Sequence, residues 1–464
     1  MQRIPSLDIT PATASAPKRF AQVNGKFYVR LTEGYFQNLR RLISWPLLAL
    51  FFATVWLTWD GQPLVLFSLA ERRIVLFGHF LSLHDLPLLA GLLIAAATLL
   101  FAMAVAWGRV WCGFACPQSI WAWLFMRIEQ WTEGSARARQ KADEQGLSRN
   151  QWLRRISKHL LWLLLALATA ITFTGYFVPV RDLASDLLQL NLMSSVWLWI
   201  TIMAGLTYLN AGLVREKICL HACPYSRFQS VMFDADTRTV SYDAARGEPR
   251  AHLRHTQPSA GDCVDCRLCV QVCPTGIDIR DGLQPACIDC GACIDACDNV
   301  MKKLQRPTGL IRFASENQLH HIRSAMLRPR LIGYGLITVL AMVAVGVGFM
   351  HKTQLLTDVQ RSRNALFTEL PDGRFCNDFQ IKLESFNPAI NRVDIQVVSK
   401  KHGTVYDLEG PTPVDIPQLH AQWQSFRVCT ASAANNGHGR EEIEFVFHYL
   451  DEIRHKSAVF FFGR

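Results

Sequence analysis

The run Cys263-Val-Asp-Cys266-Arg-Leu-Cys269-Val-Gln-Val-Cys273 sets four cysteines at the spacing C-x2-C-x2-C-x3-C. A second run, from Cys287 to Cys297, repeats this spacing. Three cysteines spaced by two residues can hold three corners of a 4Fe–4S cube, and the fourth cysteine of each run then ligates the other cluster. The two runs therefore predict a bacterial two-cluster ferredoxin domain with two 4Fe–4S clusters.

The expected ligands cross between the two runs. Cluster 1 is expected to take Cys263, Cys266, Cys269 and Cys297, and cluster 2 to take Cys287, Cys290, Cys293 and Cys273. Zinc sites and disulfides are the alternatives, but a zinc site usually shows two C-x2-C pairs instead of four cysteines at this spacing twice over. The pattern favours two clusters that carry single electrons.

Five apolar stretches explain why half of the 464 residues are hydrophobic. They carry little or no charge and cover residues 42–59, 86–107, 160–180, 192–213 and 331–350. A helix of about 20 residues crosses a bilayer core of about 30 Å, because each residue adds about 1.5 Å. The stretches predict five transmembrane helices, in preference to five buried helices of a soluble protein.

The distribution of positive charge predicts how these helices are oriented. Residues 1–41 are polar and basic with no cleavable signal, and the segment 108–158 is rich in Lys and Arg, whereas the loops on the opposite side hold few basic residues. The positive-inside rule then places the N-terminus and the ferredoxin run in the cytoplasm. The net charge of +10 gathers at span ends, so it indicates a lipid bilayer as partner and no nucleic acid.

The predicted domains follow in order. They are a cytoplasmic tail at 1–41, a four-helix membrane core at 42–213, a cytoplasmic segment at 214–330 with the ferredoxin domain near 258–305, a fifth transmembrane helix at 331–350, and a periplasmic domain at 351–464. The last domain alternates apolar and polar residues along 378–384, 392–398 and 443–449. This period of two predicts the strands of a small immunoglobulin-like β-sandwich.

Cys376 and Cys429 are the cysteines of this C-terminal domain. An oxidising periplasm permits a disulfide between them. Sequence does not fix the distance between the two residues. Two unbonded core thiols, or less favourably a copper site, therefore stand as alternatives to the disulfide.

Two more cysteine motifs follow the second and fourth apolar stretches. They read Cys112-Gly-Phe-Ala-Cys116-Pro117 and Cys219-Leu-His-Ala-Cys223-Pro224, which indicates an internal repeat of a helical hairpin. A structural disulfide is disfavoured in the reducing cytosol, and four soft thiolates together bind copper(I), zinc or an iron–sulfur cluster. Buried cysteines that only pack at helix ends are the alternative. The four thiols are candidate catalytic and metal-binding groups.

Long runs of this sequence resemble one known family. They are Gly108-Arg-Val-Trp-Cys112-Gly-Phe-Ala-Cys116-Pro-Gln118, Cys223-Pro-Tyr-Ser-Arg-Phe-Gln229, Arg246-Gly-Glu-Pro-Arg250 and Cys273-Pro-Thr-Gly-Ile-Asp-Ile-Arg280. The chain resembles the CcoG/FixG/RdxA accessory proteins of cbb3-type cytochrome c oxidase over nearly its whole length. After residue 360 the match is weaker, although Arg363-Asn364 still fits, and Cys376 and Cys429 depart from the family's usual residues.

The resemblance implies a multi-pass protein of the bacterial inner membrane. It implies reduction of copper(II) to copper(I), an oxidoreductase activity on a metal ion, in support of loading copper into the oxidase. It also implies two 4Fe–4S clusters, a functional role for the C-x3-C-P cysteines, and oxidase subunits or copper-delivery proteins as partners. Our own hypothesis is that a copper ion is held near Cys112, Cys116, Cys219 and Cys223 and receives electrons from the clusters. The electron donor is not implied.

Two other functions are consistent with the same motifs. A quinol dehydrogenase would resemble the membrane ferredoxins of nitrate-reductase systems, which share the four-span C-x3-C-P core, but the β-domain and fifth span argue against it. A non-enzymatic copper chaperone or assembly scaffold would bind copper without turnover.

Overall fold

The computed structural model describes residues 22–23, 26–59, 61–69, 73–81, 85–251, 260–325, 327–350, 354–362, 365–387, 389–416, 423–430, 439–450 and 452–462. Residues 1–21 of the predicted tail, residues 258–259 at the start of the predicted ferredoxin domain, and Arg363-Asn364 lie outside these ranges. The chain divides into two compact units. The first comprises Met1–Thr54, Leu92–Gly175 and Val180–Val343, and the second comprises Val55–Gly91, Tyr176–Pro179 and Ala344–Arg464.

Four helices in the described part of the chain are long and apolar enough to cross a membrane. They are α2 (Leu86–Trp107), α6 (Arg149–Thr174), α8 (Ser194–Thr207) with its π-helical continuation η2 (Tyr208–Val214), and α15 (Pro329–Met350). Their side chains are mostly exposed, as expected for helices that face lipid. These four agree with four of the five predicted apolar stretches.

The first predicted stretch differs from its expected form. Helix α1 (Tyr35–Thr54) ends five residues before the predicted boundary, and the chain turns into strand β3 (Thr58–Trp59). With 20 residues it is long enough to cross a membrane, but its most apolar stretch is less apolar than those of the other four helices, and its first turns carry Arg40 and Arg41. A span at α1 therefore stays a prediction.

Helix α6 begins well before the apolar stretch that predicts it. Ser148 caps the helix by accepting a hydrogen bond from the Gln151 amide, and the Gln151 side chain accepts one from the Ser148 amide. This reciprocal capping box starts the helix at Arg149. Hydropathy alone misses these turns because they carry basic residues.

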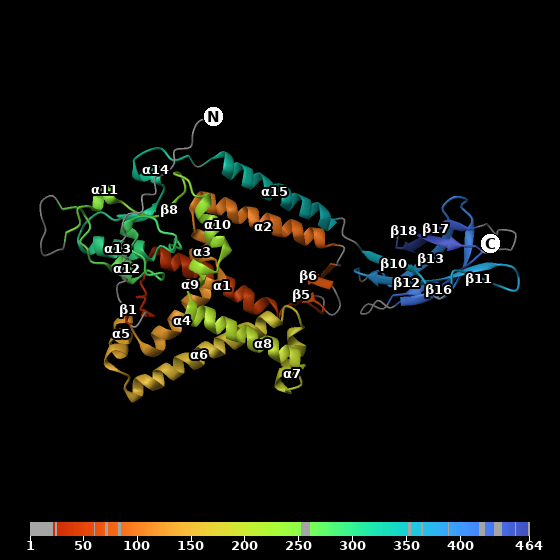
Figure 1. Ribbon diagram of the computed structural model, residues 1–464, viewed down its shortest axis with the longest axis horizontal. Helices are drawn as coiled ribbons and strands as arrows, with labels where there is room; N and C mark the ends of the chain where they lie inside the picture. Colours follow the sequence, from red (N-terminus) through yellow and green to blue (C-terminus); the bar gives the residue numbers. More distant parts are fainter. Residues whose placement is uncertain are drawn as a thin grey trace. The chain divides into compact units, whose positions relative to one another are not determined.

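The membrane helices of the first unit pack through small and aromatic side chains. Helices α2 and α15 run side by side (Figure 1), with the hydroxyls of Thr98 and Thr338 2.8 Å apart. Trp162 of α6 donates its indole N–H to the carbonyl of Phe125 in α4 (Pro117–Glu133), at 3.0 Å. Gly212 of η2 lies against the Trp162 ring. The remaining helices here are α3 (Val110–Phe114), α5 (Ala136–Gln145), α7 (Val180–Leu188), α9 (Lys217–His221) and α10 (Pro224–Met232).

The ferredoxin segment is framed by a two-stranded antiparallel sheet, in which β8 (Thr239–Tyr242) pairs with β9 (Ile311–Ala314). Between the strands lie α11 (Ala244–Gly247), α12 (Leu268–Gln271), the 3-10 helix η4 (Ile279–Asp281) and α13 (Ala292–Lys303), and α14 (Glu316–Leu319) follows. The buried core combines apolar side chains such as Ile294, Met301 and Leu310 with cysteines of both runs. The cysteine loops are thus packed inside a small core, against which Phe36 of α1 also packs.

The second unit contains the predicted β-domain. Its strands are β10 (Leu355–Arg361), β11 (Thr368–Glu369), β12 (Phe375–Ser385), β13 (Arg392–Ser399), β14 (Val405–Glu409), β15 (Val414–Asp415), β16 (Trp423–Cys429), β17 (Arg440–Tyr449) and β18 (Glu452–Phe461). They pair antiparallel in the order β10-β12-β16-β14-β13-β17-β18. Alternate residues are buried along β13, and Phe379, Phe445, Phe447 and Phe460 fill the core. The alternation in the sequence is confirmed as strand structure.

The same unit holds smaller sheets nearer the start of the chain. Strand β3 pairs with β4 (Gln62–Pro63), and β5 (Val65–Ser68), β6 (Arg73–Leu76) and β7 (His79–Leu81) form a three-stranded antiparallel sheet. In the first unit β1 (Gln22–Val23) pairs with β2 (Lys26–Phe27).

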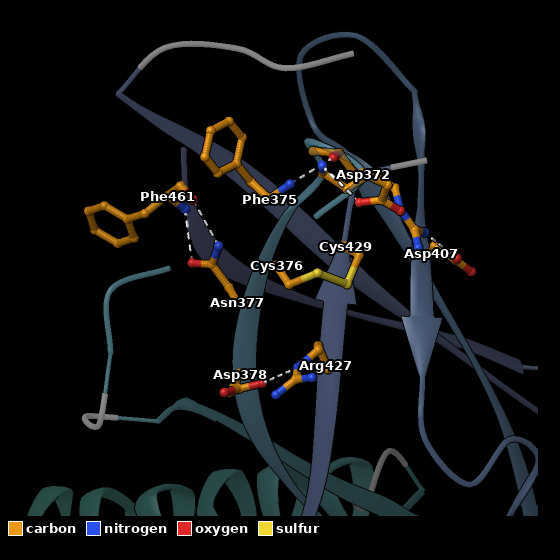
Figure 2. Close-up of a disulfide and its surroundings, with 11 residues drawn as sticks. Asp372, Phe375, Cys376, Asn377, Asp378, Asp407, Arg427, Cys429 and Phe461 are labelled. Carbon is orange, nitrogen blue, oxygen red and sulfur yellow. Dashed lines mark hydrogen bonds and ion pairs between the residues drawn. A yellow bond between two sulfur atoms is a disulfide. The ribbon is translucent and has the colours of Figure 1, made fainter. Parts of the chain in front are cut away.

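Cys376 and Cys429 form a disulfide in the β-domain. They lie directly opposite each other on β12 and β16, and their sulfur atoms are bonded (Figure 2). Both are almost fully buried. Next to the bridge, the Asn377 side chain bonds in both directions with the backbone of Phe461, and Arg427 pairs with Asp378 at 2.9 Å. Neither cysteine is a free thiol in this structure.

Candidate functional site

Two cavities in the ferredoxin segment are lined by cysteines. One is lined by Cys263, Cys266, Cys269 and Cys297, and the other by Cys273, Cys287, Cys290 and Cys293 together with Cys269, which lines both. All eight are free thiols, and the remaining walls are mainly apolar. Four thiols around an apolar cavity fit a 4Fe–4S cube, and the grouping follows the crossed order of the two runs.

The two groups of cysteines differ in exposure at one position. Cys266 of the first group is exposed, whereas all four cysteines of the second group are buried or partly buried. Burial raises the pKa of Cys269 to about 12 and that of Cys290 to about 11. A thiolate at either position therefore needs a compensating positive charge, which a bound iron cluster supplies.

The equivalent carboxylates of the two cysteine loops have different surroundings. Asp265 and Asp289 each precede the second cysteine of a run, and both have positive φ angles, 45° and 51°. Asp265 pairs with Arg280 at 2.7 Å near the surface. Asp289 is buried and accepts backbone N–H groups from Arg109 at 2.8 Å and Val240 at 3.0 Å. Burial raises the pKa of Asp289, against the opposing effect of these bonds.

Asp289 and Asp295 tie the ferredoxin segment to the membrane core. Asp295 accepts the backbone N–H groups of Phe36 at 3.1 Å and Gln37 at 2.8 Å, and so caps the start of α1 from more than 250 positions away in sequence. Asp289 does the same for the amide of Arg109, just before α3. Two carboxylates thus satisfy amides that a helix start leaves unpaired.

Backbone-to-backbone contact makes this docking close. A Cβ on Gly113, inside the first C-x3-C-P motif, would lie 2.6 Å from the Ile288 carbonyl oxygen and 2.9 Å from the Cys290 Cα. Gly291 has φ +69°, and a Cβ there would lie 2.6 Å from the Cβ and 2.7 Å from the Cγ of the Phe36 side chain. Only glycine fits these two positions without moving backbone.

The two C-x3-C-P motifs have the same local geometry. In the first, the amides of Ala115 and Cys116 both donate to the Trp111 carbonyl, at 3.0 and 2.9 Å. In the second, the amides of Ala222 and Cys223 both donate to the Ile218 carbonyl, at 2.9 and 2.8 Å. In each motif the first cysteine lies on a short helix and the second is the N-cap of a helix that begins with proline. The predicted repeat is thus also a structural repeat.

The two motifs lie beside each other. Arg109 donates to the carbonyl of Ser226 at 2.9 Å, and the Gln118 side chain donates to the carbonyls of Asn210 and Arg215 at 3.0 and 3.1 Å. The Cys112 thiol contacts Gln229 Oε1 at 3.5 Å. These bonds join residues about 100 positions apart.

All four cysteines of the motifs are partly buried, free, and close enough to interact electrostatically. Burial, followed by the charge of Cys116, raises the pKa of Cys112 to about 12, and the pKa of Cys219 is raised to about 11 by the same two causes. Within the described ranges, however, no three His, Cys, Asp or Glu side chains converge tightly enough to hold a single metal ion.

The first motif also touches the loop of the second cavity. Cys112 packs with Cys293 against the buried side chains of Ile288, Cys290 and Ala292. Arg109, which is 4% exposed, donates to the carbonyls of Pro285 and Cys287. The first C-x3-C-P motif, through Cys112, therefore lies directly beside the second cysteine cavity.

A third cavity lies on the other side of this contact. It is lined by Arg40, Arg215, Glu216 and Cys219 together with residues of α4 and of the cysteine loops, including Pro274, Thr275 and Ile288. Arg40 is buried, donates to the Ser119 carbonyl at 3.0 Å, and leaves its Nε without a partner. Burial raises the pKa of Glu216, in opposition to the Arg215 charge.

Several of these residues are not identified by motif reading. Arg109 and Gln229 lie inside the runs quoted for the family resemblance, so their place in those runs was an available signal. Asp289 had none beyond its position between two cysteines. Glu129, which is 1% exposed and pairs with Arg139 at 2.6 Å and Arg215 at 3.1 Å, sits in an unremarkable helix sequence. Long-range partners give such residues their roles.

Comparison with known proteins identifies both domains. A family model described as a 4Fe-4S dicluster domain matches residues 214–316, and one described as an IG-like fold at the C-terminal of FixG matches residues 345–464. The chain therefore contains a ferredoxin domain for 4Fe–4S clusters and an immunoglobulin-like C-terminal domain.

Three curated relatives match most of the chain. Protein RdxB of Cereibacter sphaeroides is 36% identical over 84% of this chain and 86% of its own. Protein RdxA of the same organism is 34% identical over 84% and 86%. Nitrogen fixation protein FixG of Rhizobium meliloti is 33% identical over 80% and 79%. With its ferredoxin domain and apolar helices, the chain is a membrane-associated iron–sulfur electron-transfer protein, and it belongs to the FixG/RdxA family.

Proposed function

We propose that this protein reduces copper(II) to copper(I) in support of the assembly of a cbb3-type cytochrome c oxidase. The observation that carries the proposal is the packing of Cys112 against the Ile288–Cys290 loop. This contact gives electrons from the ferredoxin domain an adjacent group of soft thiols. The identity of the substrate comes from the family resemblance.

The eight ferredoxin cysteines supply the route for electrons. Cys263, Cys266, Cys269 and Cys297 hold cluster 1, and Cys273, Cys287, Cys290 and Cys293 hold cluster 2; the two cavities support this division. The clusters, when bound, provide one-electron carriers. Because Cys266 is exposed, cluster 1 would be accessible to an external one-electron donor, and Cys290, which lies in the group of side chains that Cys112 packs against, would hold cluster 2 close to the C-x3-C-P motifs.

Cys112, Cys116, Cys219 and Cys223 receive the copper ion as substrate. One electron converts copper(II) to copper(I), which is the softer ion and the better partner for sulfur. Because burial raises the pKa of Cys112 and Cys219, these thiols carry protons at neutral pH and release them when a metal binds.

The remaining assignments concern topology and partners. We place the N-terminus and the ferredoxin domain in the cytoplasm, five helices in the bacterial inner membrane, and residues 351–464 in the periplasm. Oxidase subunits or copper-delivery proteins are the partners. Protease treatment of intact spheroplasts should remove the immunoglobulin-like domain and spare the ferredoxin domain, and the reverse pattern would contradict this orientation.

A copper(II) reduction assay on anaerobically purified, dithionite-reduced protein tests the function. We expect a copper(I)-specific chelator to report turnover in the wild type and at least tenfold less in Cys112→Ser and Cys223→Ser, with ferredoxin iron retained. Gly113→Ala should also lose activity, because its Cβ would push against Cys290 backbone. Gly205→Ala is the matched control, since nothing lies within 4 Å of that position.

If both cysteine variants reduced copper at the full wild-type rate, the C-x3-C-P thiols would have no role in transferring electrons to copper. Copper binding without turnover in the wild type would instead support the chaperone or scaffold function. Each result counts only if the absorption spectrum of the ferredoxin clusters in that protein is the same as in the wild type.

The cavity beside Arg40 favours a second candidate function, oxidation of a quinol. Glu216, whose pKa is raised by burial, would accept a proton, and Arg40 Nε would donate to a quinone oxygen. Pro274 and Ile288 line both this cavity and the second cysteine cavity, so the electron would have a short path. Reduction of the clusters by a short-chain quinol, lost in Glu216→Gln and kept in Glu144→Gln, would support this function.

A further inference from the structure

The repeat of the C-x3-C-P motif builds a group of four thiols from two matching halves. Each half contributes one cysteine from a short helix, Cys112 or Cys219, and one cysteine at a helix N-cap, Cys116 or Cys223. The N-cap positions set sulfur where free amides and the helix dipole favour negative charge. The two halves therefore present two matching pairs of sulfur ligands.

Tertiary contacts hold these halves against each other. The bonds from Arg109 to Ser226 and from Gln118 to Arg215 run between the halves, and Cys112 interacts electrostatically with the other three thiols. Arg109 also lies within electrostatic range of Cys112 and Cys219, and it is almost fully buried. One buried cation thus lies near one cysteine of each half.

The four thiols lie within electrostatic range of one another. Among the residues that the structure describes, no three ligating side chains converge on one point as a mononuclear site requires. The eight ferredoxin cysteines share this property, since they line two cavities without forming a single-ion site. Four neighbouring thiols of this kind fit a cluster, in which each thiol would bind a separate corner of the cube.

We propose that Cys112, Cys116, Cys219 and Cys223 ligate a third iron–sulfur cluster. Its place beside the Ile288–Cys290 loop makes it the next carrier after cluster 2, which loses one electron as the third cluster gains one. The cluster would occupy the four thiols, so this inference replaces the direct binding of copper to them in the proposed function: copper(II) would remain the substrate and would take its electron at the edge of the cluster. This step rests on the proposed function, whereas the presence of the cluster does not.

Metal analysis of the full-length protein, purified anaerobically in detergent, tests the assignment. We expect about twelve iron and twelve acid-labile sulfide per chain in the wild type, and about eight of each in Cys116→Ser/Cys223→Ser. Ser119→Ala/Ser226→Ala is the matched control, because these serines hold the same place two residues after each motif proline. It should keep about twelve iron.

Spectroscopy and thiol chemistry separate a lost cluster from a misfolded protein. Mössbauer spectra should show one third of the iron signal missing in the double variant, while the EPR signal of the interacting ferredoxin clusters is unchanged. In the native wild type the four thiols should resist a thiol reagent until the cluster is removed by acid.

Three outcomes decide the inference. About eight iron in the wild type, with four reactive thiols or one bound copper or zinc, overturns it. Twelve iron without copper(II) reduction supports the third cluster and contradicts the proposed function. Eight iron with copper(II) reduction contradicts the third cluster and leaves the proposed function standing.

Discussion

Cysteine is unbonded throughout the first unit and bonded in the second. The twelve cysteines of the first unit are free thiols grouped around the site, whereas Cys376 and Cys429 join two neighbouring strands. The first unit is instead cross-connected by buried charge, with Glu129 between Arg139 and Arg215 and with Asp289 and Asp295 on backbone amides. Thiols that serve as ligands must stay free, so stability there comes from other groups.

The largest expected effect concerns the crossed ligation of the two clusters. In Cys263→Ser/Cys297→Ser both substitutions fall on one cluster, so about four iron atoms per chain should be lost relative to wild type. In Cys263→Ser/Cys273→Ser they fall on different clusters, and about eight should be lost. Iron and sulfide analysis of anaerobic protein measures this. The reverse result would mean that each run ligates its own cluster.

Removal of the disulfide should have the next largest effect, and only in the second unit. The bridge closes a loop of 53 residues. Cross-linking a loop of that size stabilises by about 4 kcal/mol through the unfolded state. Cys376→Ala/Cys429→Ala should lower the stability of the immunoglobulin-like domain, measured by pulse proteolysis in urea. A reductant should lower the stability of the wild-type domain by the same amount and leave the variant unchanged. A variant as stable as the oxidised wild type would show that the bridge does not stabilise the domain.

The buried ion pairs of Glu129 with Arg139 and Arg215 should contribute a similar amount to the free energy of unfolding of the first unit, and this contribution should depend on pH. Burial alone would raise the pKa of Glu129, but Arg215 and Arg139 outweigh it and hold the pKa at about 2. A depressed pKa means that the stabilisation is complete above the unfolded value of 4.5 and is lost as pH falls toward 2.

Glu129→Gln should therefore cost about 3 kcal/mol at pH 7 and flatten the stability profile between these two pH values. Urea unfolding of the detergent-solubilised protein followed by tryptophan fluorescence measures it. Glu144→Gln on exposed α5 is the control and should leave the profile unchanged. If the stability of Glu129→Gln still fell steeply between these two pH values, a group other than Glu129 would cause the pH dependence.

The smallest effect is expected at the cap that the ferredoxin domain gives to α1. Asp295→Ala removes the acceptor for the amides of Phe36 and Gln37, and loss of a cap of this kind costs about 1 kcal/mol. Hydrogen exchange should speed up about fivefold at these amides and not in α13. Unchanged exchange would show that α1 begins without help from the ferredoxin domain.

Much of the fold could be predicted from short sequence patterns. The cysteine spacing predicts the dicluster domain, the apolar stretches predict four of the apolar helices, and alternation predicts strands β12, β13 and β17. Each pattern is local, because helix and strand periods and metal-ligand spacings are set within a few residues. The start of α6 and the end of α1 were misplaced because caps and turns, not hydropathy, set them.

The site was predicted only as separate parts. Sequence alone identifies the two C-x3-C-P motifs and the cysteine runs, but not that Arg109 bonds Ser226 or that Asp289 accepts the Arg109 amide. Asp265 and Asp289 are equivalent in sequence, and one faces solvent while the other is buried at the docking surface. Such differences depend on which part of the molecule each cysteine run packs against.

The sequence by itself therefore determined the chemistry of this protein: thiol ligands for two clusters, four further thiols, and helices suited to lipid. The tertiary structure decided which of these groups lie next to one another. It brought the two motifs together, set Cys112 against the Ile288–Cys290 loop, and left room there only for the glycine at position 113. Spacing within a loop is encoded locally, whereas contact between segments about 100 residues apart arises only when the chain packs into one core.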